Sequence, residues 1–399
     1  MQLRSILRPW AAALAASAAL LAACGGGSSS SSTEPGSLRV ALTDAPACGY
    51  EQVNVTVEKV RVHRSSTADD GDAGWSEVVL NPALRVNLLD LTNGVLAELG
   101  QTELPAGTYS QLRLQLTANG NRAPYANSIV LEGQQDEIPL DTPSAQQSGL
   151  KMNLGLTVAP NELADVVLDF DACKSVVKRG NSGRYNLKPV VTVLPRVRLD
   201  GLVAEGYVAQ PIALGSTSVS LQQRGVPVRS TVPASDGRFV LYPVPAGSYD
   251  LVVSAEGRVT AVMTGVPISA TSRTFVTPAG AAINPPSGTP RLATGAVSIG
   301  GSTTVPLATI RAAQSVAAAT VERAAVLSDA DTGLYGLSLV TGAPVITAYD
   351  PAATALNFAE DLANAGKFKL TASTEGKTPL TADVNVTDAD VDAPFVFAP

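Results

Sequence analysis

Apolar residues alternate with polar or small residues along most of the chain, beginning at 38–42. This period of two is typical of a strand with one buried face. The run at 53–62 changes phase at Glu58 and Lys59, which predicts a β-bulge. Further strands are predicted at 76–80, 85–91, 109–116, 129–131, 151–158, 165–170 and 185–194. Gly, Pro, Asn and Asp separate these runs, so the pattern indicates an all-β chain of serial antiparallel β-sandwich domains.

The first strand-rich region, 37–196, carries three recognisable segments. They are 36–46 (GSLRVALTDAP), 53–60 (VNVTVEKV) and 104–109 (LPAGTY). Together they resemble the bacterial DUF4382 domain. That family has no assigned activity, so the resemblance implies a β domain with these boundaries and implies no mechanism.

The region 197–280 carries a different set of segments, namely 201–203 (GLV), 219–221 (VSL), 235–241 (SDGRFVL) and 244–251 (VPAGSYDL). Gly237 provides a turn residue that accepts positive φ, and Phe239 and Leu241 then face one side of a strand. These segments resemble the carboxypeptidase-regulatory-like, transthyretin-like β-sandwich. The resemblance implies a compact module, and the zinc site of a peptidase is missing from this sequence.

A Pro-rich linker at 281–292 precedes a partial return of the same pattern. The segments 329–337 (DADTGLYGL) and 365–370 (AGKFKL) echo the Asp-Gly corner and the strand at 246–251. We therefore expect 293–399 to be a diverged second copy of the sandwich.

One helix is predicted within this last region. Asp350 is a suitable N-cap, Pro351 suits the first helical position, and Gly366 lies just past the end. The Ala- and Val-rich segment 310–327 fits either a helix or a strand.

Two arginines, Arg4 and Arg8, lie near the start of the chain and are followed by an apolar run at 10–23. Fourteen residues are too few to span about 30 Å of hydrocarbon as a helix, so the order of charge, apolar core and small residues indicates a secretory signal. The sequence Leu21-Ala22-Ala23-Cys24 resembles the lipobox of bacterial lipoproteins. The resemblance implies removal of residues 1–23 and acylation of Cys24, for example with palmitate. The alternative is an ordinary signal peptide that ends near a cysteine.

Residues 24–36 are rich in Gly and Ser and lack apolar periodicity, which predicts a flexible tether. Gly25, in place of Asp, resembles the signal that sends bacterial lipoproteins to the outer membrane. We therefore expect a cell-envelope protein held to the outer membrane through lipid at Cys24. The sequence leaves both the periplasmic face and the cell surface open.

Once Cys24 is acylated, Cys48 and Cys173 are the remaining cysteines. An exported compartment favours their oxidation to a disulfide. The loop between them contains 124 residues, and closing a loop of this length stabilises a fold by about 5 kcal/mol in the chain-entropy model. Two unpaired buried thiols are the alternative.

Loss of residues 1–23 lowers the number of basic residues from 28 to 26 against 35 acidic residues, so the mature formal charge is −9. An acidic surface repels nucleic acid and anionic head groups. No second apolar run is long enough to span a bilayer. We expect no nucleic-acid partner and membrane contact through lipid alone.

The sequence lacks the usual residue sets of hydrolases and cofactor enzymes. Its single histidine, His63, continues the alternation of Val60 and Val62 and is expected to face solvent. A Gly-x-Ser-x-Gly turn is missing, and one histidine with two oxidised cysteines cannot make a conventional zinc site. Walker and Rossmann glycine motifs are missing too. We therefore expect no catalytic residue, metal or cofactor.

Three groups of closely spaced aspartates are candidate calcium ligands, because calcium prefers oxygen donors. They are Asp69, Asp70 and Asp72; Asp169 and Asp171; and Asp388, Asp390 and Asp392. The last group lacks the glycine and the late glutamate of an EF-hand loop, and alternating aspartates are typical of a solvated strand face. Two carboxylates roughly 5 to 10 Å apart would also serve a glycosidase.

Exposed aromatic rings would favour carbohydrate binding, because the face of a ring stacks on the face of a sugar. Trp75, Tyr125, Tyr207 and Tyr242 fall in predicted loops or at strand ends. Aromatic residues make up only 5% of the chain, so core packing or isolated surface positions are the competing interpretation.

These patterns predict a non-enzymatic, lipid-anchored envelope protein that acts as a structural or binding module, with an envelope protein or a polysaccharide as partner. A carbohydrate-binding module is the second hypothesis, and a hydrolase is the third.

Overall fold

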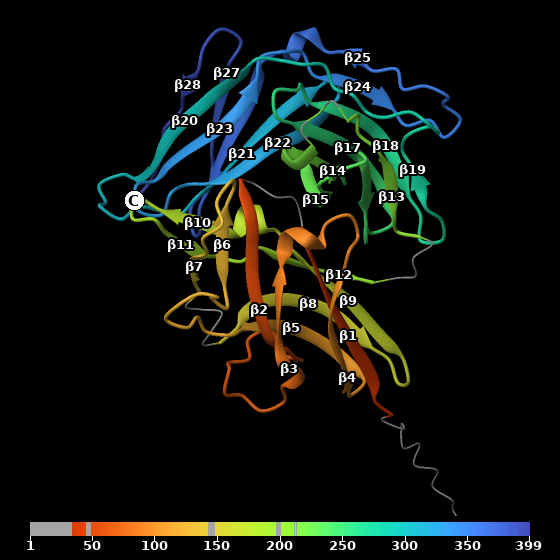
Figure 1. Ribbon diagram of the computed structural model, residues 1–399, viewed down its shortest axis with the longest axis vertical. Coiled ribbons are helices and arrows are strands. Elements are labelled where there is room, and N and C mark those ends of the chain that lie inside the picture. Colours follow the sequence, from red (N-terminus) through yellow and green to blue (C-terminus); the bar gives the residue numbers. More distant parts are fainter. Residues whose placement is uncertain (1–33, 45–48, 143–147, 197–200, 211, 213) are drawn as a thin grey trace, which may run out of the picture. The chain divides into compact units, whose positions relative to one another are not determined.

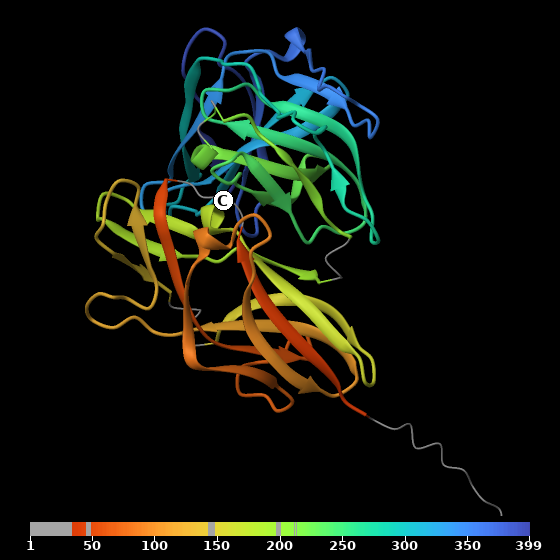
Figure 2. The ribbon, with the colours of Figure 1, turned by 45° about the vertical axis from the view of Figure 1, so that its right-hand side comes forward.

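The computed structural model describes residues 34–44, 49–142, 148–196, 201–210, 212 and 214–399. Strands dominate these residues and form six sheets. Short helical turns occur at Leu88–Leu91 (η1), Ala172–Ser175 (α2), Leu214–Ser216 (η2) and Leu362–Asn364 (η3). Figures 1 and 2 show this β-rich ribbon from two directions. The predicted all-β class is confirmed.

Two sheets form the first β domain. The smaller sheet has the order β12-β9-β1-β4, and the larger has the order β10-β11-β7-β6-β2-β5-β8 with β3 paired to β2. The smaller sheet contains β1 (Gly36–Asp44), β4 (Ala97–Leu104), β9 (Leu163–Phe170) and β12 (Val191–Pro195). The larger contains β2 (Tyr50–His63), β3 (Ser76–Asn87), β5 (Gly107–Leu116), β6 (Ser128–Leu131), β7 (Ile138–Asp141), β8 (Leu150–Val158), β10 (Val176–Arg179) and β11 (Arg184–Leu187).

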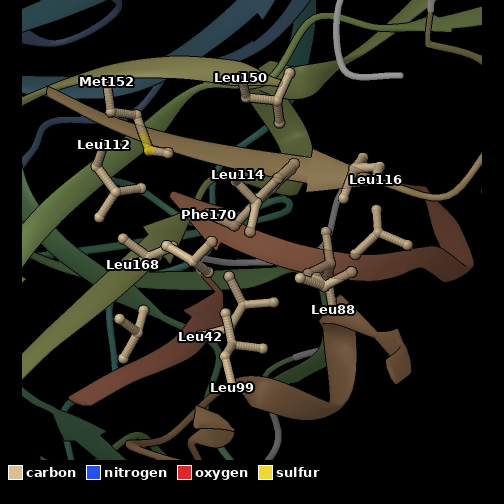
Figure 3. Packing of buried hydrophobic residues seen from close by; sticks show 14 of the residues in the cluster. Leu42, Leu88, Leu99, Leu112, Leu114, Leu116, Leu150, Met152, Leu168 and Phe170 are labelled. Atoms are coloured by element: carbon tan, nitrogen blue, oxygen red, sulfur yellow. The ribbon is translucent and has the colours of Figure 1, made fainter. Parts of the chain in front are cut away.

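The core of this domain lies between the two sheets. Leu42 and Phe170 come from the smaller sheet and pack in one cluster with Leu112 and Met152 from the larger sheet (Figure 3). All four side chains are at least nine-tenths buried. Burying a side chain of this size stabilises a fold by about 1.5 to 3 kcal/mol. The alternating apolar positions therefore supply much of the stability of this sandwich.

The predicted bulge in the second strand is confirmed, because the register of β2 shifts between Val57 and Lys59 against both β3 and β5. Two predicted boundaries are wrong. The strand predicted at 85–91 ends at Asn87, whose side chain accepts a hydrogen bond from Leu89 N and starts η1. The strand predicted at 185–194 is two strands, β11 and β12, because Pro189 between them cannot donate to a ladder.

The smaller sheet departs from the antiparallel prediction. β1 and β9 pair in parallel, from Ser37 opposite Leu163 to Asp44 opposite Phe170. The chain builds most of the larger sheet between these two strands and returns to the smaller sheet from the same end. The last residues of β1 and β9 therefore lie side by side at one end of the sandwich, where both strands finish.

Two further sheets follow, with the orders β16-β13-β19 and β15-β14-β17-β18-β24-β25. Their strands are β13 (Ala204–Tyr207), β14 (Thr217–Gln223), β15 (Val226–Thr231), β16 (Arg238–Leu241), β17 (Gly247–Ala255), β18 (Ala261–Ile268), β19 (Thr274–Phe275), β24 (Val345–Ala348) and β25 (Ala359–Glu360). We call this the second β domain. β24 and β25 follow the 281–292 segment in sequence, yet they extend the sheet of β18.

The last two sheets have the orders β23-β20-β28, with β29 also paired to β20, and β22-β21-β26-β27. Their strands are β20 (Pro290–Ile299), β21 (Thr309–Val316), β22 (Ala319–Leu327), β23 (Leu334–Val340), β26 (Lys367–Ser373), β27 (Leu380–Asn385), β28 (Val391–Asp392) and β29 (Phe395–Phe397). We call this the third β domain. The segment 310–327 is thus a hairpin, which settles the choice between helix and strand.

The helix predicted between Asp350 and Gly366 does not form. The Asp350 carboxylate accepts a hydrogen bond from Ala352 N at 2.9 Å, which makes a local turn in place of a helix N-terminus. The segment then contributes β25 to a sheet and ends in the three-residue turn η3. Pairing with β24 therefore overrides the capping pattern in this segment.

The second and third β domains share one corner geometry. Gly237 has φ 84° and a Cβ there would lie 2.2 Å from Val208 O; Gly333 has φ 71° and a Cβ there would lie 2.3 Å from Val297 O. In both corners the valine N–H donates to the glycine carbonyl, at 2.8 and 2.9 Å. Each glycine is required both by its left-handed backbone and by the close approach of a neighbouring strand.

A second motif links the first and second β domains. The Tyr109 hydroxyl donates to Pro105 O at 2.8 Å, and the Tyr249 hydroxyl donates to Pro245 O at 2.7 Å. Both tyrosines are buried and follow the same Pro-Ala-Gly sequence at the start of a strand. This is the geometry of a tyrosine corner, which fixes where the strand enters the sandwich.

Replacing Tyr249→Phe should lower the free energy of unfolding by about 1 to 2 kcal/mol, because it leaves the Pro245 carbonyl without its donor. Urea denaturation of the full chain measures the change. Tyr207→Phe is the matched control, since Tyr207 is 40% exposed. Equal midpoints for the two variants would contradict a stabilising corner.

Candidate functional site

A buried arginine joins the first and second β domains. Arg229 on β15 has a side chain that is 1% exposed and forms an ion pair with Asp169 on β9. Its Nη2 donates to the Thr43 hydroxyl on β1 at 3.0 Å, and that hydroxyl lies 2.9 Å from Leu91 O. One guanidinium from the second domain is therefore held by two neighbouring strands of the first.

We call Asp44, Asp169, Asp171, Lys174 and Arg229 the junction cluster. The parallel pairing of β1 and β9 brings the first three together, because both strands end there. The cluster contains three carboxylates and two cations, so ion pairing within it offsets most of its charge.

Asp44 is the most deeply buried carboxyl of the junction cluster. Its Oδ1 accepts a hydrogen bond from Ala172 N at 3.0 Å, and its Oδ2 has no hydrogen-bond partner among the described residues. Burial raises the pKa of Asp44 well above its ordinary value, and the nearby Asp171 and Asp169 carboxylates raise it further. Burial likewise raises the pKa of Asp169, against the opposing effect of Arg229.

Asp171 and Lys174 belong to the short helix α2. The Asp171 side chain caps the helix by accepting from Lys174 N at 3.0 Å, and it also pairs with Lys174 Nζ at 2.8 Å. Lys174 Nζ lies 3.8 Å from Glu322 on β22. Burial favours the neutral amine, but the carboxylates Asp171 and Glu322 prevail and raise the pKa of Lys174.

Glu322 continues the polar network from the second β domain to the third. Gln222 on β14 donates to Glu322 O at 2.9 Å and accepts from Glu322 N at 2.8 Å. The Glu322 carboxylate is paired with Arg311, whose Nη2 donates to Gly225 O at 2.8 Å. The Gln222 side chain thus bonds to the backbone of β22 much as a neighbouring strand would, although β14 and β22 are in different sheets.

Arg323 closes this side of the network. Its Nη2 donates to Ala255 O at 2.7 Å, and burial lowers the pKa of Arg323 to about 10. A cavity of about 220 Å³ lies against it and is lined in part by Lys174, Glu322 and the serine hydroxyls of β14, β15 and β17. At roughly 30 Å³ for each water molecule, this space suits several waters.

The side chain of the single histidine, His63, contacts an aromatic ring and a neighbouring loop. The His63 ring lies 5.0 Å from Trp75, and its two nitrogens are within 3.3 Å of Ser65 O and 3.0 Å of Ala73 O. Hydrogen bonds to the loop that starts at Arg64 therefore occupy His63. Among the described residues, no three His, Cys, Asp or Glu side chains are grouped so that they could hold a metal ion.

The aspartate groups take up hydrogen bonds and ion pairs of their own. Asp70 pairs with Arg61, and Asp72 accepts from Asp69 N at 2.9 Å. Asp390 accepts from Leu292 N at 3.0 Å, while Asp388 and Asp392 are exposed. Asp169 and Asp171 lie in the junction cluster with cationic partners.

The four candidate aromatic residues do not form one surface. Arg61 and Arg113 lie over the Trp75 ring at 4.6 and 4.9 Å, so this ring is covered by guanidinium groups. Tyr125 is half-buried in the first domain and Tyr242 is buried beside Leu96, which leaves Tyr207 as an exposed ring.

Cys173 lies in α2, which follows β9. The last residue of β9 is opposite the last residue of β1, so Cys173 is at the end of the first domain where β1 finishes. Cys24 and Cys48 lie outside the described residues, so acylation and the Cys48–Cys173 disulfide stay predictions. In the part of the chain that the structure describes, helices are all too short or too polar to cross a bilayer.

Sequence reasoning missed Arg229, Glu322 and Arg323. Arg229 occupies a polar position in an alternating strand and would be placed on a solvated face. The burial of that face follows from contact with another domain, which a strand pattern cannot indicate. The sequence carries no local signal for these three residues.

Residues 35–189 match the family model described as a domain of unknown function, DUF4382. The match confirms the predicted resemblance of the first β domain. No curated protein sequence matches the chain.

Solved structures give only remote likenesses. The Bacillus anthracis TIE protein is 10% identical, with 91% of this chain and 50% of that chain covered and a TM-score of 0.19. A streptococcal ancillary pilin is 10% identical, with 91% and 99% covered and a TM-score of 0.19. The Corynebacterium diphtheriae major pilin SpaA is 11% identical, with 91% and 100% covered and a TM-score of 0.20. The chain thus spans half the length of the TIE chain, and TM-scores this low carry no functional argument.

Replacing Arg229→Ala should lower the free energy of unfolding by about 3 to 5 kcal/mol, because it leaves the buried Asp169 without a counter-charge. The double variant Arg229→Met with Asp169→Leu should recover most of this loss, since neither charge is then buried. Chemical denaturation measures both changes.

Lys369→Ala is the control for this prediction, because it removes an exposed ion pair with Asp383. Its effect should stay within about 1 kcal/mol. If Arg229→Ala proved as mild as Lys369→Ala, the buried pair would not be what holds the domains.

The raised pKa of Asp44 predicts a pH dependence. The folded chain keeps this proton to higher pH than the unfolded chain does, so Asp44 stabilises the fold most below its unfolded pKa. That stability is lost as the pH rises through the folded pKa. Denaturation midpoints of the parent and of Asp44→Asn, measured between pH 4 and pH 9, should therefore differ more strongly as pH rises, with the variant relatively more stable. Parallel curves for the two proteins would refute the assignment.

Proposed function

We propose that this chain is a non-enzymatic structural module of the bacterial cell envelope, in which several β domains are fixed to one another and held to the outer membrane by lipid at Cys24. The observation that carries the proposal is the set of buried polar contacts between domains. Arg229 joins the second domain to the first, and Gln222 with Glu322 joins the second to the third. Domains on a flexible string would not need such contacts.

Further bonds support a fixed arrangement. Asn93 of the first domain donates through its N–H to the Thr231 hydroxyl at 2.8 Å and accepts from Val240 N at 3.1 Å. The Asp329 carboxylate accepts from Gly180 N at 2.8 Å, which joins the third domain to the first. Every pair of domains is therefore bridged, and a force on one is transmitted to the others.

The identity of the later domains is part of the proposal. The shared glycine corner at Gly237 and Gly333 supports two copies of one carboxypeptidase-regulatory-like sandwich, at 197–280 and 293–399, in which the second copy adds β24 and β25 to the sheet of the first. The Asp236-Gly237 turn precedes a buried Phe239, and both lie in the segment 235–241 on which this resemblance rests.

The proposal includes a disulfide between Cys48 and Cys173. Cys48 follows β1 by four residues, and Cys173 follows β9 by three. Because these strands are parallel and end at Asp44 and Phe170 opposite one another, a bridge at this edge would tie their ends together. It would stand beside the junction cluster and restrain the same edge.

The proposed anchor is tested by Cys24→Ser in the producing bacterium. The variant should appear in the soluble fraction, and labelling with a palmitate analogue should be lost, because serine offers no thiol for acylation. Ser29→Ala in the tether is the control and should stay with the membranes. Recovery of Cys24→Ser with the outer membrane, or absence of label on the parent, would remove the anchor from the proposal.

A further inference from the structure

The most exposed aromatic ring among the described residues of the second β domain lines a groove of that domain. Phe275 on β19 is 62% exposed, and it lines a groove of about 620 Å³. Volumes of about 300 to 1,000 Å³ are typical of sites for small ligands. Because most of the Phe275 ring is exposed, burial against another molecule would remove apolar surface from water and stabilise the contact.

A second exposed ring lies on the same sheet face. β13 and β19 pair in parallel with Glu205 opposite Phe275. Tyr207 is two residues beyond Glu205, so it points to the same side as Phe275, and it is 40% exposed. The sequence pattern points to Tyr207, at a strand end, and gives no signal for the more exposed Phe275.

The groove beside Phe275 is uncharged apart from one carboxylate. Met263 and Ala348 contribute apolar surface from β18 and β24, and the segment 350–357 contributes small residues, the hydroxyl of Thr354 and the amide of Asn357. Asp350 is the single charged side chain among the described lining residues. The lining itself holds no cation for an anionic ligand, and the nearby Arg273 is already ion-paired with Glu205.

Several polar groups of the groove have unused hydrogen-bonding capacity. The side chains of Thr277, Thr354 and Asn357 make no hydrogen bond within the described part of the chain. Asp350 uses Oδ1 for Ala352 N, which leaves Oδ2 without a partner there. The Thr347 hydroxyl also lines the groove and lies 3.4 Å from Ala348 O. The groups with unused capacity are thus one acceptor-only carboxylate, one amide and two hydroxyls.

We propose that this groove binds a neutral oligosaccharide. Sugar hydroxyls donate to a carboxylate and exchange hydrogen bonds with an amide, and the C–H face of a sugar ring packs on an aromatic ring such as Phe275. A neutral sugar needs no cation in the site. The inference rests on the proposed function, since it assigns a class of ligand to the proposed envelope module.

A microarray of neutral oligosaccharides of glucose, galactose, mannose and N-acetylglucosamine tests the proposal with the full chain. Positive sugars are then titrated by isothermal calorimetry. Phe275→Ala should weaken binding at least tenfold and Asp350→Asn should weaken it severalfold, while Phe275→Tyr should bind as the parent does. Val396→Ala is the matched control, because Val396 is 59% exposed on β29 in the third domain.

Both substitutions are at exposed positions, so equal urea midpoints are expected and separate lost binding from lost folding. An array without positive sugars would overturn the proposal, as would undiminished binding by Phe275→Ala. So would a dimer, measured by light scattering, that Phe275→Ala dissociates, because the groove would then serve self-association. None of these results alters the fractionation of Cys24→Ser, so the anchor and the sugar site fail independently.

Discussion

The buried ion pair between Arg229 and Asp169 is the constraint on which the arrangement of this protein depends. Two charges removed from water cost several kcal/mol each, and their mutual attraction repays this only with good geometry and further hydrogen bonds. Thr43 supplies one of those bonds. The pair therefore contributes orientation more than net stability: the guanidinium is tolerated only where the two domains meet in this one way.

That geometry in turn requires the parallel pairing of β1 and β9. In an antiparallel arrangement Asp44 and Asp169 would lie at opposite ends of the sheet, and no single arginine could reach both strands where they end. The parallel register instead places Asp44 and Asp169 close together where β1 and β9 end. At that end of the sheet α2 contributes Lys174 and the third domain contributes Glu322. The electrostatic network is thus a consequence of chain topology.

The proposed binding groove is separate from this network. The groove beside Phe275 is formed by β18, β19 and β24 and the segment after β24, whereas the junction cluster involves β1, β9, α2 and β15. A ligand there would not need to disturb buried charges.

The sequence by itself determined the all-β class, most strands of the first domain, the bulge at Glu58 and the glycine corners, because period-two burial and positive-φ turns are local properties. It misjudged the segment after Asp350, where a capping pattern was present but pairing with β24 was stronger. The junction cluster and the groove were decided only by tertiary structure. Whether Arg229 is buried or Phe275 exposed depends on which surface a distant part of the chain covers, and alternation within a strand specifies that a face exists without specifying what packs on it.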